Sequence, residues 1–251
     1  MVVQVVIFQA KPRGKHPKLY QNEAFSTMTR QTIQFGDEGQ AASREMLRRY
    51  DALVAGRASA MDPAEAADLR RELATLESLD HQYGGAAPIA LEGAEELVAS
   101  ILPRLARLED PELVIAAAVW AMRHRVGIAA VEPAVNALAE RSNRAAGRQE
   151  LSAVAGLMMA LAEHVRDRLG ADLERSNPER PWRVLHANLA ITAIRSEDPA
   201  LVDAAFDALD AALPDERGAF YAEALALALA PGIAPEVRSR IEARHRRWSA
   251  R

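Results

Sequence analysis

The sequence predicts an all-α protein, in which a helical hairpin is followed by antiparallel helix pairs that resemble a short α-solenoid. Three observations predict this class. About one residue in five of the 251 is Ala, the strongest helix former, and aromatic residues make up only 5%. From Gln40 onward, apolar residues recur at spacings of three and four, which marks one face of a helix. Gly and Pro then divide the chain into segments of helical length.

Residues 1–27 differ from the rest of the chain and are expected to be an atypical basic N-terminal extension. They contain all three lysines of the chain and carry a net charge of +3. Because Met28 would serve as a start, we expect an incorrectly assigned start or an appended, disordered leader. The alternative is a basic arm, or a short strand over Val2–Gln9, that docks elsewhere.

Neither a secretory signal nor a membrane span is predicted. The apolar run Val2–Phe8 precedes the positive charges, which is the reverse of the order in a signal peptide. The longest later apolar stretches, Leu113–Met122 and Leu151–Ala162, fall short of the roughly 18–20 residues that cross a bilayer. We therefore expect a soluble, cytoplasmic protein.

Residues 39–79 are expected to form the helical hairpin, with helices over about Ala41–Gly56 and Pro63–Leu79. Asp62 supplies an N-cap and Pro63 a first-turn proline, so the start of the second helix is well signalled. Two short amphipathic helices bury their apolar stripes poorly without help. The hairpin should therefore pack on the rest of the chain, the alternative being a homodimer through a four-helix bundle with a second copy.

Residues 88–251 are expected to form a helical-repeat-like domain. Glu109–Val114 and Glu197–Val202 share the pattern Glu-Asp-Pro-x-Leu-Val at an offset of 88 residues, or two units of about 44. That unit length is typical of two-helix repeats of the HEAT kind, whereas the tetratricopeptide consensus is not met. The expected helices are Leu91–Leu108, Pro111–Arg125, Ala129–Ser142, Gln149–Leu173, Pro181–Arg195, Pro199–Leu213, Glu216–Ala230 and Pro235–Trp248.

The sequence holds no recognisable catalytic or cofactor motif. Cys is absent, which excludes disulfides, thiolate metal sites and iron–sulfur clusters. The phosphate loop, the dinucleotide fingerprint, the nucleophile elbow and the paired histidines of zinc proteases are also missing. We expect no cofactor and no metal, and the sequence leans away from an enzyme.

Two Trp–His pairs form the sharpest pattern. Trp120 and His124, like Trp182 and His186, are four residues apart and so share one helix face. If the helices stack in register, both pairs line one groove for a peptide side chain or a small ligand, with His164 and Asn188 nearby. The alternative is that each Trp fills a helix interface that Ala cannot fill.

The C-terminal helix carries a basic surface. Its arginines favour contact with nucleic acid or an acidic membrane surface, but cations near a helix C-terminus also complement the helix dipole, and a last helix often caps a solenoid. The structural interpretation is the stronger one. The residues are Arg238, Arg240, Arg244, Arg246 and Arg247.

These observations rank three functions. The leading hypothesis is a non-enzymatic protein–protein interaction module, such as a scaffold, adaptor or partner-specific chaperone. Its basis is the missing catalytic constellation, the extended helical surfaces and the net charge of −12 over residues 28–237, which suits a basic partner. The alternatives are a ligand-binding protein or enzyme that uses the Trp/His groove, and nucleic-acid binding through the C-terminal helix, which the acidic body disfavours.

Overall fold

The computed structural model describes residues 37–56, 61–84, 88–89, 92–173, 175–228 and 233–249. Its regular elements in these ranges are all helices, so the predicted all-α class is confirmed. The expected extension over residues 1–27 lies outside the described residues. The helices are α2 (Asp37–Gly56), α3 (Pro63–Tyr83), α4 (Ala94–Ala106), α5 (Pro111–His124), α6 (Glu132–Arg144), α7 (Arg148–His164), α8 (Arg166–Leu169), α9 (Pro181–Ser196), α10 (Pro199–Ala212), α11 (Arg217–Ala228) and α12 (Pro235–Ser249).

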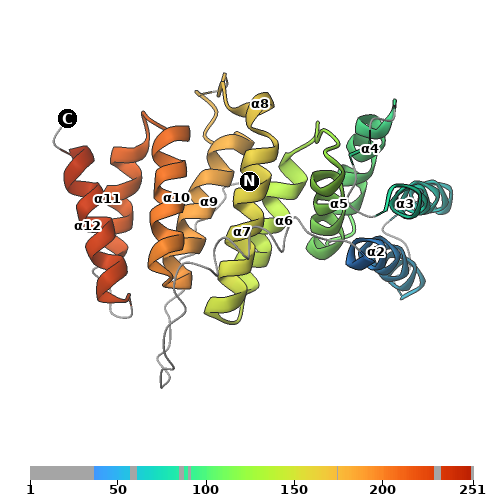
Figure 1. Ribbon diagram of the computed structural model, residues 1–251, viewed down its shortest axis with the longest axis horizontal. Helices are drawn as coiled ribbons and strands as arrows, with labels where there is room; N and C mark the ends of the chain where they lie inside the picture. The colour runs from blue at the N-terminus through green and yellow to red at the C-terminus, as the bar shows by residue number, and fades with distance from the viewer. Residues whose placement is uncertain are drawn as a thin grey trace.

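The helices form an elongated array that follows chain order from α2 and α3 at one end to α11 and α12 at the other (Figure 1). Most contacts join helices that are neighbours in the sequence, and α7 packs on α9 across the short α8. Helices α2 and α3 are viewed nearly end-on, whereas α9 to α12 run up the page, so the axes of the hairpin helices cross those of α9 to α12 (Figure 1). None of the described helices is long and apolar enough to span a bilayer.

The hairpin forms as its capping residues predict. The Asp62 carboxylate accepts a hydrogen bond from the Ala64 N–H at 2.8 Å, and Pro63 opens α3. The helix ends at Gly84, whose φ of 72° is left-handed and costs glycine little. Helix α2 packs on α5 and α3 packs on α4. The apolar stripe of the hairpin is therefore covered within the chain.

The two Glu-Asp-Pro segments build the same turn. Glu109 and Glu197 both have a left-handed backbone, with φ of 54° and 55°. Asp110 and Asp198 follow as N-caps, and a proline then opens α5 and α10. The repeated sequence pattern thus corresponds to one type of turn, which joins α4 to α5 and, again, α9 to α10.

The prediction of a single helix over Gln149–Leu173 is wrong, because α7 ends at His164 and is followed by the one-turn α8. The buried Val165 leaves helical geometry, with φ −98° and ψ 4°. The His164 Nε2–H donates to the Val126 carbonyl at 2.9 Å, which fixes the end of α7 against the α5–α6 connection. A tertiary contact thus ends a helix that the local pattern would continue.

Because the two turns match, the contributions of the N-caps Asp110 and Asp198 to stability can be compared. Asp110 also accepts two hydrogen bonds from Arg49 of α2, at 2.9 and 3.0 Å, whereas Asp198 accepts hydrogen bonds from the backbone N–H groups of Ala200 and Leu201. We expect Asp198→Ala to lower the free energy of unfolding by about 1 kcal/mol, and Asp110→Ala by about 2–3 kcal/mol. Urea unfolding of both variants measures the difference. Equal losses would show that the Arg49 contact adds nothing.

Candidate functional site

The first Trp–His pair lies in the interface between α5 and α3. Trp120 is 1% exposed, and its indole N–H donates to the Leu76 carbonyl of α3 at 3.2 Å. The Trp120 and His124 rings are in contact, with centroids 4.7 Å apart. Trp120 and His124 lie on the same face of α5, as their i, i+4 spacing predicts, and both side chains point towards α3.

An acidic residue that the sequence analysis missed is the partner of His124. Asp80 of α3 is fully buried, accepts a hydrogen bond from His124 Nε2–H, and lies 3.2 Å from the Arg123 guanidinium. A buried carboxylate needs such partners, because its desolvation is otherwise costly. Its place in the sequence could have indicated its burial, because Asp80 follows Leu76 by one helical turn and so continues the apolar stripe of α3. This cluster joins the hairpin to the array.

The second Trp–His pair lies on α9. His186 is 3% exposed, and its Nδ1–H donates to the Trp182 carbonyl one turn earlier at 2.9 Å. The two rings meet edge to face with centroids 4.2 Å apart. The buried Trp182 Nε1 has no hydrogen-bond partner among the described residues. Asn188 donates to the Val184 carbonyl of its own helix at 2.8 Å.

The six residues of the expected groove thus have separate surroundings. The first pair contacts α3, the second bonds within α9, and His164 bonds to the α5–α6 connection. None of the six lines either of the two hollows described below. Their hydrogen bonds are those of residues that pack helices together.

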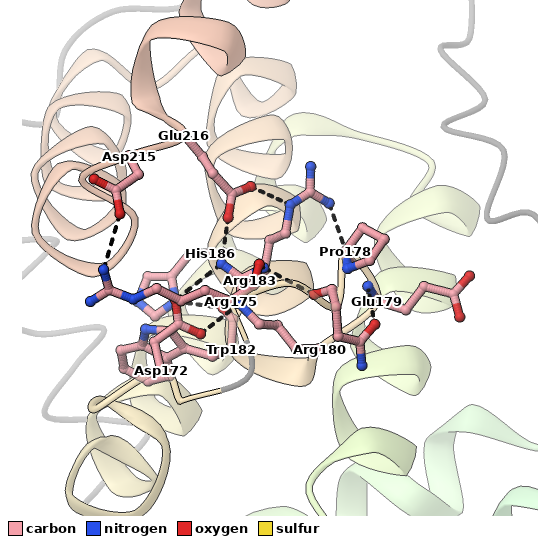
Figure 2. Close-up of polar contacts among 11 residues, drawn as sticks. Asp172, Arg175, Pro178, Glu179, Arg180, Trp182, Arg183, His186, Asp215 and Glu216 are labelled. Atoms are coloured by element: carbon pink, nitrogen blue, oxygen red, sulfur yellow. Dashed lines mark hydrogen bonds and ion pairs between the residues drawn. The ribbon is translucent and has the colours of Figure 1, made fainter.

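Arg180, just before α9, is the centre of a polar network that the sequence gave no reason to single out (Figure 2). Its side chain is 5% exposed, and all five of its N–H donors are used. Two donate to the Asp172 carboxylate at 2.5 and 3.0 Å, two donate to the Arg175 and Asn177 carbonyls, and one donates to Glu216. The network ties the α8–α9 connection to the start of α11.

The network surrounds a charged hollow of about 320 Å³. Glu216 also accepts from Arg183, and Arg175 pairs with Asp215 at 3.0 Å across the hollow's rim (Figure 2). Burial raises the pKa of the Glu216 carboxyl, but the hydrogen bonds and positive charges of Arg183 and Arg180 outweigh it and lower that pKa below its usual value. The lining carries three arginines and three acids, namely Arg175, Arg180, Arg183, Asp172, Asp215 and Glu216.

Leu173 lies beside this hollow and is exposed to solvent. Its side chain is 91% exposed, against 39% for Val54 and Leu227, the other exposed large apolar residues in the described part of the chain. It follows Asp172, whose backbone is left-handed at φ 46° and whose carboxylate is held by Arg180. A buried ion pair therefore fixes the turn that presents a solvent-exposed leucine.

The basic surface of α12 faces an acidic stripe on α10. Arg240 pairs with Asp203 at 2.9 Å, and Arg244 pairs with both Asp207 and Asp210. Trp248 donates from Nε1 to Asp210 at 3.1 Å. The central arginines of the helix are thus neutralised within the chain.

The remaining arginines of α12 lie around this contact. Arg246 is exposed, with Glu242 at 3.9 Å, and Arg247 lies 4.8 Å from the Trp248 ring. Arg238 is partly buried, and its Nε has no hydrogen-bond partner among the described residues.

A second, apolar hollow of about 490 Å³ lies between α2 and α3. The Tyr50 hydroxyl donates to the Ala66 carbonyl at 2.8 Å at its base, and Val54 and Ala67 lie at its mouth. Its two charged lining residues, Asp51 and Arg70, pair with each other at 2.8 Å. The hollow is therefore apolar with a neutral rim.

No group of three or more His, Asp or Glu side chains within the described ranges could hold a metal ion. Comparison of the chain with protein-family models, curated proteins and solved structures found no match.

Removal of the Arg180 side chain should strongly reduce the stability of the protein. Arg180→Met leaves Asp172 and two carbonyls without their donors, and we expect a loss of about 3–5 kcal/mol in the free energy of unfolding. Arg175→Met removes an exposed ion pair and should cost at most about 1 kcal/mol. Urea unfolding checks both, and a loss below 1 kcal/mol for Arg180→Met would refute the structural role.

His186 should make stability depend on pH. Burial lowers its pKa and the Arg166 charge lowers it further, while the Trp182 carbonyl and Asp172 oppose the shift. The unfolded chain therefore takes up a proton as pH falls below about 6.5, before the folded protein does, and stability falls by up to about 1.4 kcal/mol per pH unit.

His186→Gln should remove this contribution, so its stability should approach that of the wild type as pH falls from 7 to 5. His81→Gln, at an exposed position of α3, is the control and should run parallel to the wild type. Thermal unfolding across this range measures the gap between the curves. A constant gap for His186→Gln would contradict the assignment.

Proposed function

We propose that this protein is a non-enzymatic interaction module built on a short α-solenoid of antiparallel helix pairs. The sequential packing of the helices supports a solenoid, as does the turn shared by α4–α5 and α9–α10. Such an array offers extended surfaces to a partner protein. The partner contact is assigned to the edge formed by Leu173 and the charged hollow beside it.

The main observation behind this proposal is an exposed apolar side chain that stands on a turn already held in place. Leu173 is 91% exposed, and the Arg180–Asp172 pair holds its turn before any partner arrives. A backbone turn that is already held in place loses less conformational entropy when its exposed side chain binds a partner. Apolar anchors surrounded by polar groups are the common anatomy of protein interfaces.

The chemistry of this edge defines the partner. Leu173 fits an apolar pocket, and the ion pairs of Arg175 and Arg183 lie where charged side chains of the partner would surround that pocket. The net charge of −12 over residues 28–237 favours a partner with a basic surface. The occupant is therefore a folded protein with an apolar pocket and a basic rim.

The contacts of the other candidates favour this function over its alternatives. His124 and His186 are buried and bonded within the chain, so neither is presented to a substrate. Arg240 and Arg244 are paired with acids of α10, which reduces the positive charge that α12 offers to phosphates.

Leu173→Ser should abolish partner capture without loss of stability, because the side chain is exposed and an anchor truncation typically weakens binding more than tenfold. The measurement is affinity capture from an extract of the cells that make the protein, with quantitative mass spectrometry of retained proteins.

Leu227→Ser, at the exposed leucine of α11, is the matched control and should retain the partner. A partner that binds both variants and the wild type equally would refute the assigned edge, and retention of no protein at all would refute the interaction module.

A further inference from the structure

His186 is a buried titratable side chain next to the Arg180 network. Its ring lies beside the network in Figure 2, and the charge of the Asp172 carboxylate acts on it. All three side chains are shielded from water, because His186 is 3% exposed, Arg180 4% and Asp172 9%. The contacts that hold the Leu173 turn therefore share one buried region with a group that titrates near neutral pH.

A proton added to His186 has no acceptor in the described part of this region. The Nδ1–H already donates to the Trp182 carbonyl at 2.9 Å, and no described residue accepts a hydrogen bond from Nε2. Both oxygens of Asp172 are bonded to Arg180, and the charge of Arg166 on α8 also acts on the ring. A buried cation without an acceptor is costly, so the closed network disfavours the protonated ring.

The helices packed against α9 do not change this balance. His164 of α7 is bonded to the Val126 carbonyl, and Asp210 of α10 accepts from the Tyr221 hydroxyl. The other charged side chains of α6, α7 and α10 are exposed or held in ion pairs. The response of His186 to pH therefore depends on the network and on α8.

The network can open without unfolding of the array. Ser176, Asn177 and Glu179 of the α8–α9 connection are exposed, and the bonds of Arg180 hold the connection against α9 and α11. Connections with few buried apolar contacts open at a lower free energy than packed helices. An open network lets water reach His186, and the protonated ring is then hydrated.

We propose that His186 is an acid-sensitive switch of the Leu173 edge, whose protonation opens the Arg180 network and releases the partner. The inference rests on the proposed function, because it regulates the same site. Burial lowers the pKa of His186 in the closed form, so the open form takes up the proton first as pH falls. The open form therefore gains up to about tenfold in population for each pH unit below about 6.5.

Amide hydrogen exchange of the full chain, followed by NMR at pH 7 and pH 5 and corrected for intrinsic rates, tests the switch without a partner. The Asp172 N–H bonds to the Leu169 carbonyl at 2.9 Å and the Arg180 N–H to the Asn177 carbonyl at 3.3 Å. Both should lose protection at least tenfold at pH 5. The Glu197 N–H, in the α9–α10 turn, is the control and should keep its protection.

His186→Gln and His186→Phe remove the titrating group, and protection of the Asp172 and Arg180 amides should then be the same at both pH values. The phenylalanine retains an aromatic ring beside Trp182, so it serves if the glutamine variant folds poorly. His81→Gln, at an exposed position, should behave like the wild type. Protection that survives pH 5 in the wild type, or is lost equally in the His186 variants, overturns the switch.

Partner capture at the two pH values separates this inference from the proposed function. The wild type should lose the partner at pH 5, whereas His186→Gln should retain it. Capture by the wild type that persists at pH 5 refutes the switch and leaves the interaction module standing. Acid opening of the network, with no protein captured even at pH 7, refutes the interaction module instead.

Discussion

Buried acidic side chains that bind donors from another helix fix which helices of this array lie together. Asp80 of α3 holds His124 and Arg123 of α5. Asp210 of α10 accepts from the Tyr221 hydroxyl of α11 at 2.9 Å, and also from α12. Ala-rich helix faces are shallow and discriminate weakly between partners, whereas a buried carboxylate without its donors is costly. The order of the array therefore depends on these directional contacts as well as on apolar burial.

The sequence predicted the helices better than their contacts, and the reason is physical. Caps and breaks are local, so Asp62, Asp110 and Asp198 start their helices where the Asp-Pro pattern indicates. The i, i+4 spacing also put each Trp and its His on one helix face, and the structure adds that the two rings of each pair are in contact. Helix α7 was predicted too long because a tertiary bond ends it. The Arg180 network depends on where two connections meet, which no local pattern encodes.

The uneven charge of the chain has a structural counterpart at its C-terminal end. The net charge of +5 over residues 238–251 is partly balanced by the acidic stripe of α10, because Arg240 and Arg244 pair with that stripe. Histidines and arginines that suggested a groove or a phosphate site thus contribute to packing. Leu173 is the most exposed of the large apolar residues in the described part of the chain.

The central claim is that Leu173 contacts a partner, and photo-crosslinking in the living cell tests it most directly. A benzophenone amino acid at position 173 of the full chain should yield one adduct of defined mass, while the same group at position 227 yields none. Leu227 is the other exposed leucine of the described residues, at 39% against 91% for Leu173. No adduct from position 173, or the same adducts from both positions, would contradict the account.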